Sequence, residues 1–175
     1  MAIAYRPEIW RDLFVMVGGA AAALVGLLFI VMSLYFNAIR NNSDYSMSAT
    51  VHAARNNTYH LLTVMITSAL VLAPQPPHIL GIELVFIHLF GLRLPVLFTY
   101  THFVAHRGGF PLNMTLTIGA GYLLGVAGGI TLIVHPSWGL YPVAASCVIL
   151  LVRTVLTAWM LMFERRRGVA AAEEG

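Results

Sequence analysis

The residues best suited to chemistry lie inside long apolar stretches of this sequence. They are Glu83, His88, Arg93, Arg153 and His60. An ionisable side chain inside a bilayer is costly, about 2.5–3.5 kcal/mol for a central Arg, so each one is a candidate functional residue. Glu83, His88 and Arg93 share one stretch and, at about 100° per residue, point in three directions around a helix. That helix is therefore either surrounded by protein, or one of the three groups reaches the lipid headgroups, which Glu83 does most easily.

Arg93 and Arg153 form a candidate anion site. We expect them at similar depth on two different helices, and the only acidic residue within an apolar stretch is Glu83. Glu83 lies ten residues before Arg93, about 15 Å away along a helix axis, so the two cannot pair within it. Two interpretations follow: the arginines compensate an anion, or each bonds helix carbonyls and water as a structural group.

Histidines raise the question of a metal or haem. His60, His88 and His102 lie on the apolar stretches, and two opposed His with nearby Arg would suit a b-type haem. No pair of them has an i, i+4 spacing, and Cys147 is the only cysteine. We therefore predict no metal and no cofactor, with haem b as an alternative. The sequence also lacks a nucleophile motif, a phosphate-binding loop and paired carboxylates, so we predict that the protein is not an enzyme.

The elements that position these residues are five apolar runs. The chain has 175 residues, is 59% hydrophobic and only 10% charged, and has a mean hydropathy of +0.80. Soluble domains are about 45–50% apolar and about 25% charged, so this composition indicates a chain solvated by a bilayer. The predicted fold is an all-α bundle of five transmembrane helices. The expected spans are 13–36, 58–73, 79–100, 114–134 and 140–163.

These spans make up one domain, residues 1–167, followed by a tail, 168–175, that we expect to be disordered and cytoplasmic. The connection from 37 to 57 is either a flexible loop or a loop with a short helix on the membrane surface. Six arginines lie on the C-terminal side of the predicted bundle and two on the N-terminal side. The positive-inside rule then places the C-terminus in the cytoplasm and the N-terminus outside, as a multi-pass protein of a bacterial plasma membrane.

Small residues predict where helices approach closely. Gly121, Gly125 and Gly129 are spaced by four in the fourth run, and Gly18 and Gly26 belong to a similar row in the first. Such rows let a second backbone come near in a bilayer. The pattern does not distinguish a neighbour within the chain from another copy.

Several segments resemble a known family. Residues 10–14 read WRDLF, residues 18–34 read GGAAAALVGLLFIVMSL, 81–84 read GIEL and 158–161 read AWML. Together they are similar to small bacterial membrane proteins often labelled modulators of the FtsH protease. The resemblance implies a polytopic membrane protein and assigns no role to Arg93 or Arg153.

We therefore expect a non-enzymatic membrane protein that acts by helix–helix contact, as an accessory or regulatory subunit of a membrane complex. Its partners would be the lipid bilayer and another membrane protein or copies of itself, and not nucleic acid. One alternative is a small oligomeric channel or carrier for an anion that uses Arg93 and Arg153. Another is a haem-binding membrane protein.

Overall fold

The computed structural model describes the backbone of residues 7–41, 45–105 and 112–173, with side chains over 8–33, 54–93 and 115–159. A short 3-10 helix, η1 (Pro7–Trp10), leads into α1 (Arg11–Asn41). The other helices are α2 (Tyr45–Leu72), α3 (Pro77–Ala105), α4 (Leu112–Val134) and α5 (Leu140–Glu173). The described backbone is helical apart from its turns, which confirms the all-α prediction.

Among the residues with described side chains, three helices are long and apolar enough to cross a membrane, where the sequence predicts five spans. They are Glu8–Ser33, Thr115–Val134 and Leu140–Trp159. α2 is not among them because Asn57, His60 and other polar residues lower its hydropathy. The described side chains of α3 end at Arg93, which is short of a full span.

The helices extend beyond the runs that predict them, and α2 and α5 extend the most. α2 begins at Tyr45, so residues 45–57 of the segment predicted as a loop or a separate surface helix are its continuous first part. α5 continues to Glu173, through residues 168–173, for which the sequence predicts disorder. The Ala-rich composition of 170–172 favours this extension, since Ala has the highest helix propensity.

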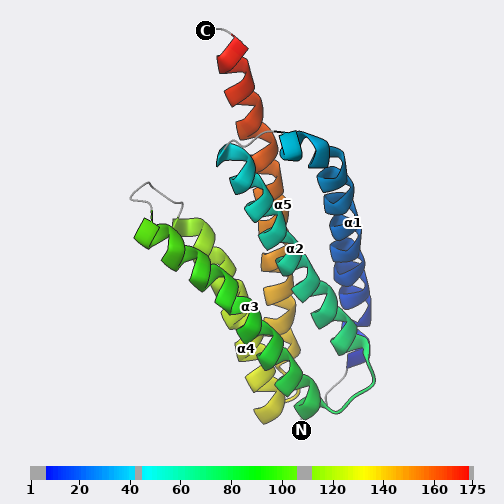
Figure 1. The fold of residues 1–175 in the computed structure, drawn as a ribbon. Helices are drawn as coiled ribbons and strands as arrows, with labels where there is room; N and C mark the ends of the chain where they lie inside the picture. The colour runs from blue at the N-terminus through cyan, green and yellow to red at the C-terminus, as the bar shows by residue number, and fades with distance from the viewer. Residues whose placement is uncertain (1–6, 42–44, 106–111, 174–175) are drawn as a thin grey trace.

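Successive helices run up and down and pack as antiparallel neighbours (Figure 1). The most extensive contacts join α3 to α4, α4 to α5, and α1 to α2, and α2 also packs on α5 and α3. The α3–α4 pair leans away from α2 and α5 toward the end at which α5 terminates (Figure 1). α2 and α5 therefore form the centre, with α1 on one side and α3–α4 on the other.

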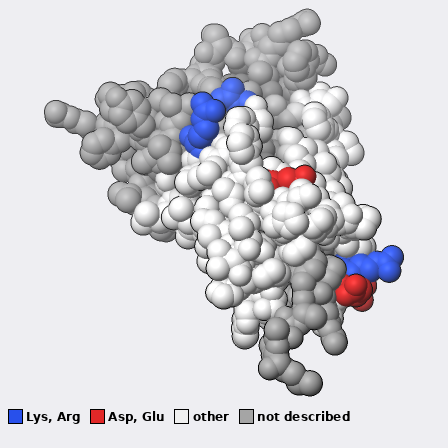
Figure 2. Space-filling model, turned by 90° about the horizontal axis from the view of Figure 1, so that it is seen from below, with Lys and Arg blue, Asp and Glu red and all other residues white. Residues whose placement is uncertain are grey.

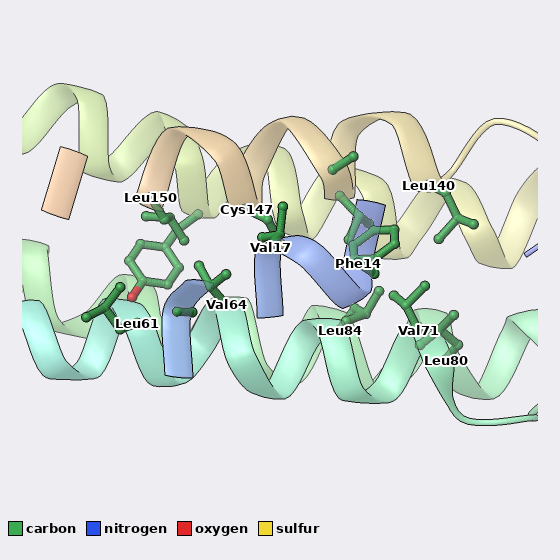
Figure 3. Close-up of a cluster of buried hydrophobic side chains, with 14 of the residues drawn as sticks. Phe14, Val17, Leu61, Val64, Val71, Leu80, Leu84, Leu140, Cys147 and Leu150 are labelled. Atoms are coloured by element: carbon green, nitrogen blue, oxygen red, sulfur yellow. The ribbon is translucent and has the colours of Figure 1, made fainter. Parts of the chain in front are cut away.

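An apolar core fills the end of the bundle near the α2–α3 and α4–α5 turns (Figure 3). Phe14 and Val17 of α1 meet Val64 and Val71 of α2 and Leu84 of α3 there. The outer surface is also apolar: Phe86 is 76% exposed, and Val15, Phe29 and Leu123 are exposed as well. Flanks of this kind are suited to lipid rather than to water. Figure 2 views the bundle from its lower end in Figure 1, where few of the described side chains are charged.

Candidate functional site

Many of the described polar side chains lie in the interior of the bundle. The buried ones are Asn57, His60, Thr63, Thr67 and Ser68 of α2, His88 of α3, and Ser146, Thr154 and Thr157 of α5. In the part of the chain with described side chains, polar groups thus concentrate where α2 faces its neighbours. This distribution is the reverse of that in a soluble protein and places the candidate site inside the bundle.

Tyr122 of α4 is the centre of this interior cluster. Its hydroxyl lies 2.8 Å from Nδ1 of His60 and 3.5 Å from Oγ1 of Thr63, both on α2. The Tyr122 ring also contacts the His60 ring, with centroids 5.6 Å apart, and meets the His88 ring edge-on at 6.2 Å. One tyrosine therefore links α4 to α2 by a hydrogen bond and to α3 by a ring contact. We call His60, Thr63, His88 and Tyr122 the Tyr122 cluster.

Two glycines on facing helices make room for these rings. A Cβ atom added at Gly91 of α3 would overlap the Tyr122 ring, and one added at Gly125 of α4 would overlap the His88 imidazole. α3 thus carries the His88 ring and places Gly91 opposite Tyr122. α4 carries the Tyr122 ring and places Gly125 opposite His88. Because the two arrangements are reciprocal, α3 and α4 approach closely while burying both rings.

His88 is held in one tautomer by its own helix. Its Nδ1 lies 2.9 Å from the carbonyl oxygen of Leu84, which can only accept, so Nδ1 carries the proton and Nε2 the lone pair of the neutral ring. Nε2 is buried and has no hydrogen-bond partner. Gly125 of α4 packs against this ring, since a Cβ added at Gly125 would overlap the Cδ2, Nε2 and Cγ atoms of His88.

Of the other two haem candidates, His60 and His102, the structure describes only the side chain of His60. Nδ1 of His60 faces the Tyr122 hydroxyl. The side chain of His102 lies outside the described residues. Among described side chains, no group of three His, Cys, Asp or Glu could hold a metal ion.

The two arginines of the candidate anion site lie in different surroundings. Arg93 is exposed, and its guanidinium carbon lies 5.6 Å from the centre of the Phe90 ring on the same helix. Arg153 is half-buried, and its Nε is fully buried with no hydrogen-bond partner. α3 and α5 are not among the helix pairs with extensive contact. The helices that carry the two arginines are therefore not extensively packed on each other.

Glu83 lies near the α2–α3 turn, half-buried, and accepts a hydrogen bond from Nε2 of Gln75 at 3.0 Å. The same amide nitrogen lies 3.0 Å from the carbonyl oxygen of Leu70. Gln75 therefore ties the end of α2 to the first turns of α3, and the Glu83 carboxylate helps to hold this turn.

The predicted glycine contacts divide between several neighbours. Gly129 lies against Gly81 of α3, since a Cβ at either position would come within 2.6–2.7 Å of the other's carbonyl oxygen. Gly121 instead faces Leu150 of α5, and Gly18 faces Ser68 of α2. Gly26 has no atom within 4 Å of the position of a Cβ. Sequence reasoning missed Gly81, Gly91 and Gly128, whose irregular spacing forms no recognisable row.

An unoccupied row of small residues runs along the outer face of α1. Gly19, Ala23 and Gly26 are exposed, at spacings of four and three that place them on one side of the helix. A Cβ at Gly19 or Gly26 would meet nothing in the described structure. We call these three residues the α1 face.

Comparison with known protein families, with curated proteins and with solved structures finds no match to this chain. The site is therefore interpreted from its own geometry.

Proposed function

We propose that this protein is a multi-pass membrane protein in which all five helices cross the bilayer. The reversed distribution of side chains supports this, because polar groups are buried inside while aliphatic and aromatic groups cover the outside. Exposed Trp138 and Tyr141 lie at the α4–α5 turn, where an interfacial aromatic belt is expected. α2 carries most of the buried polar residues among the described side chains, and neighbouring helices cover them.

Within the membrane, the protein acts without catalysis, by contact with another membrane helix as an accessory or regulatory subunit. The observation that carries this proposal is the α1 face. α1 is the least covered of the three apolar spans, because 17% of its apolar stretch is buried, against 39% and 44% for the stretches in α4 and α5. A row of small residues on an uncovered helix lets a second helix approach closely, as at the crossing of Gly81 and Gly129. The partner is another membrane protein or a second copy of this chain.

The test is a set of three glycine substitutions made in the intact protein. Gly26→Leu should reduce the size of the complex extracted in mild detergent while the bundle keeps its melting temperature, because residue 26 touches nothing in the chain. Gly119→Leu is the matched control, since Gly119 is an equally open glycine on α4 and should change neither property. Gly18→Leu should lower the melting temperature, since its side chain would meet Ser68.

The outcome is decided by the size of the complex. If the Gly26→Leu and Gly119→Leu proteins elute with the same mass as the parent, the α1 face contacts lipid and the contact role fails. A cysteine placed at Ala23 should also cross-link to its neighbour in native membranes, and mass spectrometry of the product identifies a second copy or a different protein.

The alternative functions have less geometric support. An anion path shared by Arg93 and Arg153 needs the two side chains to face one space, and their helices have no extensive contact. A haem held by His60 and His88 would need both rings to face one open space, and the Tyr122 ring lies against each of them. We therefore favour the contact role.

A further inference from the structure

A shallow groove runs along the outside of the bundle between α2 and α3, with a volume of about 270 Å³. Tyr59 and Ile66 of α2 form one wall, and Phe86 and Phe90 of α3 form the other. All four side chains are exposed at the rim. Thr63 and Gly91, both buried, form the floor.

The groove is oriented along the helices and so along the expected membrane normal. Phe86 and Phe90 lie nine and thirteen residues after Pro77, about 14 and 20 Å along the axis of α3 at 1.5 Å per residue. The walls thus cover the middle of a hydrocarbon layer about 30 Å thick. A surface groove of this direction and apolar character matches an extended hydrocarbon chain.

Arg93 lies at one end of this groove. It is sixteen residues after Pro77, about 24 Å along the axis, so its long side chain reaches the headgroup level of the bilayer. The guanidinium lies against the ring of Phe90, which is itself a wall of the groove. No described carboxylate forms an ion pair with Arg93, so its positive charge is available to an anion.

We propose that the groove and Arg93 together bind an anionic glycerophospholipid. The acyl chain lies between Tyr59 and Phe86, and the phosphate accepts hydrogen bonds from the Arg93 guanidinium. Arg is suited to this role because its planar fork donates two parallel hydrogen bonds to a phosphate. The charge on Arg93 selects the headgroup and the apolar walls hold the tail. This site is separate from the α1 face, and its test does not depend on the partner of α1.

The experiment measures lipid binding to the purified, delipidated protein by native mass spectrometry and by thermal shift. Phosphatidylglycerol and phosphatidylcholine with identical acyl chains are compared, so that only the headgroup differs. We expect phosphatidylglycerol to bind more tightly. Arg93→Gln should weaken its binding about 10- to 150-fold, which corresponds to the loss of about 1.5–3 kcal/mol for a hydrogen bond to a charged group. Arg93→Lys keeps the charge without the fork and should fall between the two.

Matched controls separate this site from a general response to lipid. Arg153→Gln removes an arginine outside the groove and should keep the preference for phosphatidylglycerol. Ile66→Trp narrows the groove and should weaken both lipids, whereas Ile130→Trp, at an exposed position of α4, should weaken neither. Circular dichroism and size-exclusion chromatography confirm that each variant is folded.

Three results would overturn the proposal. The first is an unchanged preference for phosphatidylglycerol in the folded Arg93→Gln protein. The second is an effect of Ile66→Trp on lipid binding that is no greater than the effect of Ile130→Trp. That result would show that the acyl chain does not lie in the groove. The third is full stabilisation by glycerol phosphate, which has the headgroup chemistry without acyl chains and would identify a site for a free anion.

Discussion

Among individual residues, Tyr122 is unusual because its ring packs between helices while its hydroxyl forms a hydrogen bond. The aromatic ring is fully buried and fills the space that Gly91 leaves between α3 and α4. The hydroxyl then needs a partner, since water is excluded there, and the nearest is Nδ1 of His60 on α2. A phenylalanine would fill the same space without specifying which turn of α2 lies opposite.

Replacing this tyrosine should therefore separate packing from hydrogen bonding. Tyr122→Phe keeps the ring and should lower the free energy of unfolding by about 1 kcal/mol, the usual range for a polar contact between membrane helices. Unfolding in mixed micelles with increasing sodium dodecyl sulfate measures it. Tyr59→Phe, at an exposed tyrosine, is the control and should change little.

A double-mutant cycle with His60→Ala then assigns the effect to a pair. If His60 and Tyr122 stabilise each other, the loss in the double variant should be smaller than the sum of the two single losses. Simple additivity would show that the hydroxyl and the imidazole do not interact in the folded protein.

The position of His88 depends on Gly125 in the same direct way. Gly125→Ala would place a methyl group inside the imidazole, so α3 and α4 must separate or His88 must change rotamer. We expect a loss of about 1–3 kcal/mol, as for other overpacked cores. Adding His88→Ala should recover part of the lost stability, whereas the same His88→Ala alone should destabilise the parent. Equal melting of Gly125→Ala and the parent would contradict this packing.

The sequence identifies some of these residues and not others. His60 and His88 stand out because a bilayer tolerates an ionisable group only where protein covers it, and both are buried. Tyr122 does not stand out, because a tyrosine in an apolar run is unremarkable until its partner is known. The partner depends on the rotation of α2 against α4, which no local pattern encodes.

For the helices, the α3–α4 pair has the most extensive contact in the fold. Its close approach rests on Gly81 and Gly129, whose backbones touch, and on the rings seated opposite Gly91 and Gly125. In a bilayer, helices gain little from apolar contact alone, because lipid tails are equally apolar. Close backbone packing and buried polar contacts therefore decide which helices pair.

This predicts a difference between glycines of one helix. Gly129→Ala should weaken the α3–α4 pair and lower the melting temperature, because its methyl group would press on the Gly81 carbonyl and on Val85. Gly119→Ala makes the same chemical change in open surroundings and should leave the melting temperature unchanged or slightly raised, since Ala favours helix. Similar losses in both variants would mean that helix propensity rather than packing sets their stability.

The number and order of helices are predictable from the sequence because each apolar run is long enough to be recognised on its own. The side of each helix that contacts a given neighbour is harder to predict. Gly121, Gly125 and Gly129 form one row in the sequence, yet the row is shared between α5 and α3. A helix in contact with two neighbours presents small residues to both, and only the packed structure separates them.

On the scale of the whole molecule, the bundle is built with polar groups inside and apolar groups outside. This arrangement gives each helix one covered side, and it explains how α2 can carry most of the buried polar residues among the described side chains. These polar residues need the cover of other helices before they are stable in lipid. A membrane protein of this kind is recognised from its composition, whereas the depth and pairing of its polar groups follow from the fold.

Topology is the remaining property of the whole molecule. The start of α1 and the end of α5 lie at opposite ends of the bundle, as an odd number of crossings requires (Figure 1). Arg165, Arg166 and Arg167 are at the end of α5, and Arg40 and Arg55 lie toward the same end, near the connection between α1 and α2. Positively charged residues are retained on the cytoplasmic side during insertion, so this end should face the cytoplasm.

Reporter fusions test both the number of crossings and their direction. A reporter joined after Gly168 should be active as a cytoplasmic fusion, and one joined before Trp10 should be active on the outer side. Activity of both fusions on the same side would require an even number of crossings, and would exclude α2 or α3 as a span. Activity of each on the opposite side would keep five crossings but reverse the orientation. Replacing Arg165, Arg166 and Arg167 together with Gln should weaken the preference for a cytoplasmic C-terminus, because those charges make up half of the arginines that favour it.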